Sequence, residues 1–212
     1  MHDNKPEILQ VGPHADLTIF LVHGRGHSPR DMRPLAERLG VTNVRYIFPA
    51  ATDNTWYPKP FQHPVEDNEP WLSAAIAHYE DLVTRELAAG TPAERIIIGG
   101  FSQGACLTNE FLARHPRRYA GAIIWTGGLI GPPGTIWPHN DKLEDMPAYI
   151  STSENDPWVP APRVRESHAW LRSCGASATM MIFKERDHGV IDEEIGPVRG
   201  MIERQRRNVL SI

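Results

Sequence analysis

The stretch Arg95-Ile-Ile-Ile-Gly-Gly-Phe-Ser-Gln-Gly104 decides the fold class of this chain. Its apolar run ends at two glycines and places Ser102 two residues before Gly104, which predicts a buried strand, a sharp turn and the start of a helix. Glycine at positions 100 and 104 removes side chains that would collide in such a turn, so the Ser102 hydroxyl would be exposed at its apex. The helix that begins near Gln103 would add an unpaired backbone N–H, and the positive end of its dipole, where an oxyanion could form.

Strand-like and helix-like segments alternate along the rest of the chain. The apolar runs predicted as strands are 17–22, 44–48, 96–99, 120–126, 148–151 and 179–183, with 8–11 as an antiparallel edge strand. The stretches with apolar residues three and four apart, predicted as helices, are 29–39, 70–89, 103–114, 162–172 and 192–206. This alternation predicts an α/β fold with a mostly parallel central sheet covered by helices on both faces. We expect residues 1–212 to form a single domain of this kind.

Composition and charge exclude several classes of function. The chain has 212 residues, 41% of them hydrophobic and 23% charged, which is enough to bury one substantial core. Its net charge is −4 and its Lys and Arg residues are scattered, so it lacks the basic stripe of a nucleic-acid-binding protein. A basic cluster of Arg204, Arg206 and Arg207 closes the last predicted helix, where positive charge suits the helix dipole. We interpret this cluster as a solvated face rather than a binding patch.

The sequence also predicts the compartment of the protein. The stretch Met1-His-Asp-Asn-Lys5 shows no charged-then-apolar signal pattern, and no apolar run approaches membrane-spanning length. The two cysteines, Cys106 and Cys174, lie far apart at predicted helical positions and have no metal-ligand spacing, which is typical of reduced thiols. We therefore expect a soluble, cytoplasmic protein without stable membrane insertion.

A serine nucleophile needs a base, and the base needs an orienting acid. In hydrolases with this strand-turn-helix arrangement, the acid and the histidine follow the serine along the chain, each in a loop after a later strand. Asp156 and His188 occupy such positions, so we predict that they form a catalytic triad with Ser102. Glu154 is the nearest alternative acid, and any single loop histidine is more often a solvated surface group than a base. The weaker candidates for the base, which end a helix, precede the acid or lie mid-helix, are His115, His139 and His168.

The first long strand is predicted to end in Val22-His-Gly-Arg-Gly26. Its glycines would allow the backbone to face the nucleophile, so the backbone N–H of Arg25 would be a second oxyanion donor beside that of Gln103. The alternative is a glycine-rich turn without a catalytic part. His23 and His27 have the spacing of some zinc pairs, but Gly-Arg-Gly between them does not suit a helix and includes no glutamate. We therefore expect no metal site and no cofactor.

With these residues the chain resembles the α/β-hydrolase fold and, within it, the small carboxylesterase, lysophospholipase and acyl-protein thioesterase family, across nearly its whole length. The segments that carry the resemblance are His23-Gly24, Pro49-Ala50, Trp56-Tyr57, Gly99-Gly-Phe-Ser-Gln-Gly104, Asp156 with Val159-Pro160, and His188. The resemblance implies the triad and the oxyanion donors named above. The chain has no insertion long enough for a separate lid between the sixth strand and the acid, so no separate lid domain is expected. The family usually has an apolar residue where Arg25 stands, a further glycine where Ala105 stands, and a His-Gly pair where Ser151-Thr152 stand. The His-Gly-Arg-Gly form is similar to a bacterial branch of small esterases.

The two long irregular segments, 49–69 and 127–147, both follow predicted strands and would meet at the edge of the sheet where open α/β sheets bind ligands. The side chains expected to wall an open, shallow acyl site are Trp56, Tyr57, Phe61, Leu129, Trp137 and Trp158, with ordinary loop packing as the alternative for each one.

The expected function is that of a serine carboxylesterase, which hydrolyses a small-molecule ester of small or medium size through an acyl-enzyme. An acyl thioesterase or a lysophospholipase with the same triad is the alternative, and a non-catalytic hydrolase-fold binding protein is a remote one. No nucleic-acid partner is expected, and a homodimer is left open.

Overall fold

The protein is described by a computed structural model that covers residues 2–210. Its strands are β1 (Glu7–Val11), β2 (Leu17–Phe20), β3 (Val44–Phe48), β4 (Ile96–Phe101), β5 (Gly121–Trp125), β6 (Pro147–Ser153) and β7 (Ser177–Phe183). Its α-helices are α1 (Pro29–Leu39), α2 (Trp71–Ala88), α3 (Gln103–Arg114), α4 (Ala161–Ser173) and α5 (Asp192–Leu210). Short 3-10 helices cover Thr52–Asn54, Val65–Asn68 and Ala93–Arg95.

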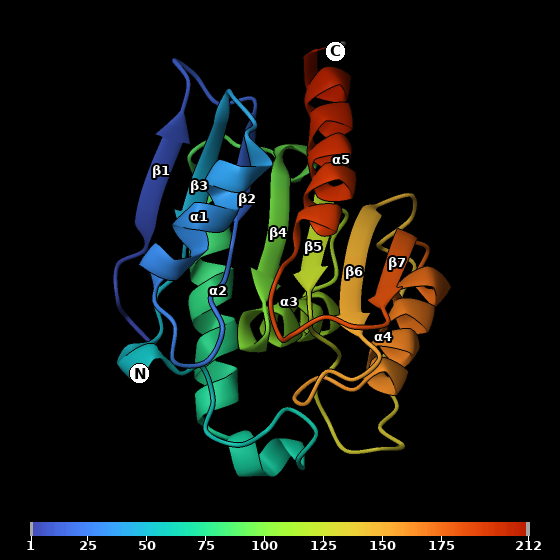
Figure 1. Cartoon of the computed structure of the whole chain (residues 1–212). Helices are drawn as coiled ribbons and strands as arrows, with labels where there is room; N and C mark the ends of the chain where they lie inside the picture. Colours follow the sequence, from blue (N-terminus) through green and yellow to red (C-terminus); the bar gives the residue numbers. More distant parts are fainter. Residues whose placement is uncertain (1, 211–212) are drawn as a thin grey trace.

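The strands form one seven-stranded sheet in the order β1-β3-β2-β4-β5-β6-β7. Strand β1 pairs with β3 in the antiparallel direction, and all other neighbours are parallel. The predicted α/β fold and its antiparallel edge strand are therefore confirmed. The carboxyl ends of the six parallel strands point toward the lower edge of Figure 1, where the long loops gather.

Helices cover both faces of the sheet, with α2, α3 and α4 on one face and α1 and α5 on the other (Figure 1). Each face of the sheet has its own apolar cluster. The central strand β4 contributes to both clusters: Ile96 and Ile98 pack on the side of α2, α3 and α4, and Ile97 packs on the side of α1 and α5. All three isoleucines are fully buried. A continuous apolar run of this kind is typical of a parallel strand that has helices on both sides.

Some elements differ in length from the prediction. Strand β4 continues to Phe101, because Gly100 and Phe101 still pair with Ile124 and Trp125 of the neighbouring strand. Strand β2 ends at Phe20, and Val22 adds only an isolated bridge to Gly100. Because Gly100 and Phe101 are still paired with β5, strand β4 runs without interruption to the turn at Ser102.

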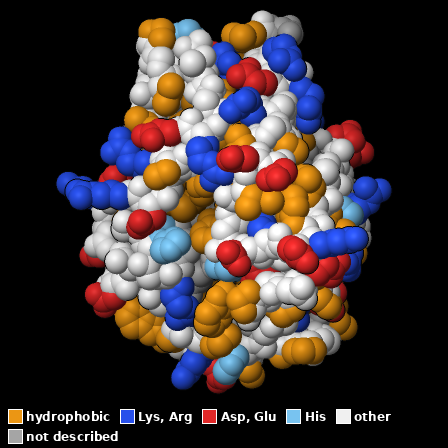
Figure 2. Space-filling model, viewed as in Figure 1, with side chains coloured by type: hydrophobic (Ala, Val, Ile, Leu, Met, Phe, Trp, Pro, Cys, Tyr) orange, Lys and Arg blue, Asp and Glu red, His pale blue; other side chains and the backbone are white. Residues whose placement is uncertain are grey.

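The surface of the protein carries charges of both signs (Figure 2). Acidic and basic side chains are interspersed over the face in Figure 2, and within residues 2–210 no helix has the length and apolarity needed to span a membrane. Arg206 is not simply solvated, because it forms ion pairs with Asp16 and Glu203.

Both cysteines are buried and unpaired, although Cys174 caps α4 rather than lying within it. Burial raises the pKa of the Cys106 thiol to about 12, so this thiol stays protonated.

Candidate active site

Ser102 lies in the turn between β4 and α3, which we call the serine turn (residues 100–104). Its φ of 54° and ψ of −120° are sparsely populated for a residue with a side chain. A Cβ atom on Gly100 would lie 2.7 Å from the carbonyl oxygen of Val22, and one on Gly104 would lie 2.6 Å from that of His23. Both glycines are therefore required by the close approach of the segment after β2, and the predicted strand-turn-helix conformation is confirmed.

The serine, a histidine and an aspartate form a continuous line of hydrogen bonds at the carboxyl edge of the sheet. His188 Nε2 lies 2.8 Å from Ser102 Oγ, and His188 Nδ1 lies 2.9 Å from Asp156 Oδ2. Because the carboxylate faces Nδ1, the neutral ring donates its Nδ1–H to Asp156 and accepts the Ser102 hydroxyl at Nε2. This arrangement allows the imidazole to remove the serine proton.

Asp156 is the acidic partner in this line, and Glu154 is not. Burial alone would raise the pKa of Asp156, but hydrogen bonds from His188 and from the backbone N–H groups of Val159 and Trp158 outweigh it and hold the pKa below its usual value. The Asp156 carboxylate is therefore ionised at neutral pH. The Glu154 carboxylate is exposed and accepts a 2.6 Å hydrogen bond from Arg165 instead.

The loop that carries His188 is stabilised by a buried ion pair that the sequence analysis did not identify. We call this segment, residues 184–191, the histidine loop. Arg186 Nη1 lies 2.8 Å from Glu194 Oε2 of α5, and both side chains have an exposed fraction of 0%. The same guanidinium donates to the carbonyl of Gly189 and to the hydroxyl of Thr126, which follows β5. The ion pair thus connects the histidine loop to α5 and to the end of β5.

Further donors complete the shell of Glu194. Its carboxylate accepts hydrogen bonds from the hydroxyls of Ser151 and Tyr149 on β6 and from the backbone N–H of Ile191. Thr126 has a positive φ of 55°, which is rare for a β-branched residue, and its hydroxyl accepts the bond from Arg186. The only sequence signal for this network is an arginine two residues before the candidate base.

The backbone N–H of Gln103 belongs to the serine turn, and the backbone N–H of Arg25 belongs to the segment after β2. A Cβ on Gly24 would be 3.2 Å from Ser102 Cβ, so the segment after β2 runs directly against the nucleophile. Within residues 2–210, neither of the two N–H groups donates to a protein acceptor. The Gln103 side chain binds the neighbouring loop through the N–H of Trp56 at 3.0 Å and the carbonyl of Tyr57 at 2.8 Å.

His23 supports the same loop and does not face the serine as a second base. Its Nδ1–H donates to the carbonyl of Gly24, and its Nε2 accepts the N–H of Ala51. Burial lowers the pKa of His23 to about 4, so the ring is neutral at pH 7. The ring of His27 stacks on Phe101 with the centroids 5.9 Å apart.

A cleft of about 460 Å³ opens above Ser102, with Gln103 and His188 beside it. Its remaining lining residues are Arg25, Tyr57, Pro58, Pro60, Phe61 and Trp158. Trp158 is 70% exposed, which is unusual for an indole ring and leaves it free to contact a substrate.

The structure differs from the expected cleft wall at three positions. Trp56 and Leu129 have exposed fractions of 0% and belong to the core, and neither lines the cleft. The Trp56 indole points inward because its N–H donates to the carbonyl of His23. Trp137 lies in a separate groove beside Ile136. Sequence showed that these residues are apolar and lie in loops, but their direction depends on contacts with distant segments.

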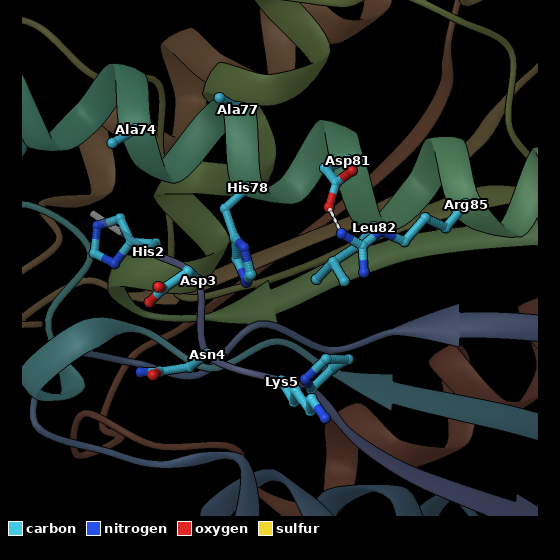
Figure 3. A pocket seen from close by; sticks show the side chains of 11 residues that line it. His2, Asp3, Asn4, Lys5, Ala74, Ala77, His78, Asp81, Leu82 and Arg85 are labelled. Atoms are coloured by element: carbon cyan, nitrogen blue, oxygen red, sulfur yellow. Dashed lines mark ion pairs between the residues drawn. The ribbon is translucent and has the colours of Figure 1, made fainter.

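A second pocket, of about 390 Å³, lies between residues 2–6 and α2 (Figure 3). Its lining includes the ion pair Asp81–Arg85, which is drawn as a dashed line in the figure. None of its lining residues belongs to the Ser-His-Asp line. His2 in this pocket donates from Nε2 to the carbonyl of Trp56 and accepts the N–H of Thr52 at Nδ1, so the N-terminal segment supports the loop beside the cleft.

Several known proteins resemble this chain in sequence and in fold. A family model described as Phospholipase/Carboxylesterase matches residues 4–205. The crystal structure of a phospholipase/carboxylesterase from Dyadobacter fermentans superposes with a TM-score of 0.89 at 36% identity, covering 96% of this chain and 98% of that one. Acyl-protein thioesterase 1 of Eremothecium gossypii is 31% identical over 176 residues, which are 73% of this chain and 72% of the relative. Carboxylesterase SOBER1 of Arabidopsis thaliana is 21% identical over 204 residues, which are 88% of this chain and 90% of the relative.

Proposed function

The chain belongs to the phospholipase/carboxylesterase family of α/β-hydrolases, and from this membership we propose that it is a carboxylesterase that hydrolyses small or medium carboxylic esters. The relatives are named carboxylesterases and acyl-protein thioesterases, and the chain is accordingly a serine hydrolase. The observation that carries the proposal is the hydrogen-bonded line from Asp156 through His188 to Ser102 beneath an open cleft.

Catalysis begins with acylation of Ser102. His188 Nε2 removes the hydroxyl proton as Ser102 Oγ attacks the ester carbonyl, and Asp156 stabilises the imidazolium that forms. The developing oxyanion accepts hydrogen bonds from the backbone N–H groups of Arg25 and Gln103. The N–H of Gln103 is suited to this role because it begins α3 and lies at the positive end of the helix dipole. His188 then returns its proton to the alcohol, which leaves.

Deacylation uses the same groups with water in place of the alcohol. His188 removes a proton from water, the hydroxide attacks the acyl carbonyl, and the second oxyanion uses the same two N–H groups. Collapse of this intermediate releases the carboxylic acid and returns the proton to Ser102 Oγ. An open cleft suits this step because water reaches the acyl-enzyme directly.

The size of the cleft favours compact substrates. A volume of about 460 Å³ accommodates a short acyl chain or a small aromatic group between Tyr57, Phe61 and Trp158. Thioester hydrolysis is the second candidate, because a thiol leaving group would use the same machinery and several relatives are named acyl-protein thioesterases.

A substrate panel tests both candidates. We would measure kcat/KM for p-nitrophenyl esters from acetate to palmitate and for one matched pair of butyryl oxygen ester and butyryl thioester, with Ser102→Ala as the blank. We expect the acetate to butyrate esters to be hydrolysed best and the oxygen ester to exceed the thioester. A preference for the thioester would support the second candidate, and Ser102-independent hydrolysis would contradict both.

A further inference from the structure

The side chain of Arg25 lines the cleft and is fixed by three consecutive backbone carbonyls. Its Nη1 donates to the carbonyl of Pro58 at 2.8 Å, and its Nη2 donates to those of Tyr57 and Lys59 at 2.9 Å each. The guanidinium also lies 5.9 Å from the centroid of the Tyr57 ring. A guanidinium has five N–H donors, so two remain for a ligand.

The positive charge of Arg25 has no carboxylate partner among residues 2–210. Arg163 offers a matched comparison, because it also donates to two loop carbonyls, those of Leu129 and Gly131. Arg163, however, forms an ion pair with Glu166 at 2.8 Å. An arginine that holds a loop through its carbonyls can thus have a carboxylate partner as well, and Arg25 has none.

The cleft itself supplies no negative charge to Arg25. Of the nine residues described as lining it, none is Asp or Glu, and Arg25 is the one that carries a permanent charge. The Asp156 carboxylate is engaged by His188 and by two backbone N–H groups. The lining of the cleft therefore carries one permanent charge, the positive charge of Arg25, although the whole chain has a net charge of −4.

We propose that Arg25 binds a carboxylate group of the substrate, so that the preferred esters are monoanions carrying a free carboxylate besides the ester. Half-esters of short dicarboxylic acids belong to this class. The three carbonyls hold the guanidinium in place before the substrate arrives, so little side-chain entropy is lost on binding. This inference rests on the proposed ester hydrolysis and adds the charge of its substrate.

A paired assay tests the proposal. Monoethyl succinate, glutarate and adipate would each be compared with the corresponding ethyl ω-amide, which is nearly isosteric but neutral, by pH-stat titration at pH 7.5 and low salt. We expect the best carboxylate to exceed its amide by about tenfold in kcat/KM, the size of one charge-assisted hydrogen bond. In Arg25→Met the ratio should fall to about one, and Arg25→Lys should retain part of it.

The ratio separates substrate recognition from any general damage to the 57–59 loop, because such damage lowers both activities equally. Arg165→Gln is the matched control, since it removes an exposed arginine outside the cleft and should leave the ratio unchanged. If Arg25→Met fails to fold, two other measurements test the proposal. They are the carboxylate-to-amide ratio in Arg25→Lys and the inhibition of the wild-type enzyme by glutarate compared with neutral glutaramide. A wild-type ratio of about one, or one that persists in the Arg25 variants, would overturn the inference while ester hydrolysis stood. Failure to hydrolyse any ester would instead contradict the proposed function.

Discussion

Ser102 and His188 lie 2.8 Å apart, yet the protein positions them by different means. The serine turn is a local backbone conformation around Ser102, in which Gly100 and Gly104 leave room for the carbonyl groups of Val22 and His23 in the segment after β2. The histidine loop is defined by side chains from several elements, with Arg186 and Glu194 at the centre. The serine turn therefore depends on the absence of side chains and the histidine loop on their presence.

This difference shows why one half of the site was visible as a motif. A turn that needs glycine at fixed positions leaves the same short pattern wherever it occurs. A charge network across β5, β6 and α5 can be assembled from residues at many sequence separations, so it leaves no such pattern.

Removing the nucleophile should have the largest effect on activity. Ser102→Ala should lower kcat by about 10⁶, as when a triad loses its nucleophile, because His188 then has no hydroxyl to deprotonate. Circular dichroism and urea unfolding should show an unchanged fold, since the alanine keeps the Cβ of the turn. A variant that retained a tenth of the wild-type esterase activity would refute the assignment of Ser102.

Removing the charge of the acid should have the next largest effect. Asp156→Asn should lower kcat by about 10⁴, because an amide stabilises the wrong tautomer of His188 and does not stabilise the imidazolium. Glu154→Gln is the control and should change kcat little, because Glu154 pairs with Arg165 at the surface. The reverse result would identify Glu154 as the acid of the triad and contradict the geometry of this loop.

Breaking the ion pair of the histidine loop should reduce stability strongly. Arg186→Met leaves Glu194 buried without its cation, which should lower the free energy of unfolding by about 3–5 kcal/mol. The double variant Arg186→Met with Glu194→Gln should recover part of the loss. The exposed pair supplies the control, because Arg165→Gln should cost at most about 1 kcal/mol in the same urea titration. Equal losses in the two arginine variants would mean that the buried pair does not stabilise the loop.

Adding one methyl group to the serine turn should cost less. Gly104→Ala would bring a Cβ against the carbonyl of His23, and the forced backbone shift should lower the free energy of unfolding by about 1–3 kcal/mol. Gly200→Ala in α5 is the matched control, because the nearest atom to its added Cβ, apart from its chain neighbours and the helix backbone, is Nη1 of Arg204 at 3.5 Å, and alanine favours a helix by up to about 1 kcal/mol. Unchanged stability in Gly104→Ala would show that the turn tolerates a side chain.

The smallest effect concerns the cleft that both regions face. Each methylene buried against Trp158 or Phe61 contributes about 0.8 kcal/mol, so kcat/KM should rise about fourfold per acyl carbon and level off after the first few. Trp158→Ala should flatten this rise, whereas Ile136→Ala, in the separate groove, should not. Preference for long acyl chains below their aggregation concentration would favour a lysophospholipase or acyl-protein thioesterase instead.

The site was only partly predictable from sequence, and particular residues show why. Asp156 and His188 could be selected because loops after parallel strands meet at one edge of the sheet, so chain order was sufficient. Trp56 and Leu129 were expected in the cleft wall and lie in the core, because apolar character does not show which way a loop side chain points. Arg25 was considered for its backbone N–H, while its guanidinium contacts carbonyls more than thirty residues away.

Patterns in the sequence were sufficient to predict the succession of strands and helices along the chain, the burial of β4 on both faces and the conformation of the serine turn. These features depend on apolar periodicity and on glycine, which act over a few neighbouring residues. The ion pair behind His188, the inward direction of Trp56 and the unpaired charge of Arg25 in the cleft arise only in the folded chain. Such features arise where segments distant in sequence pack together, and the energy of each contact depends on burial and partners that the folded chain supplies.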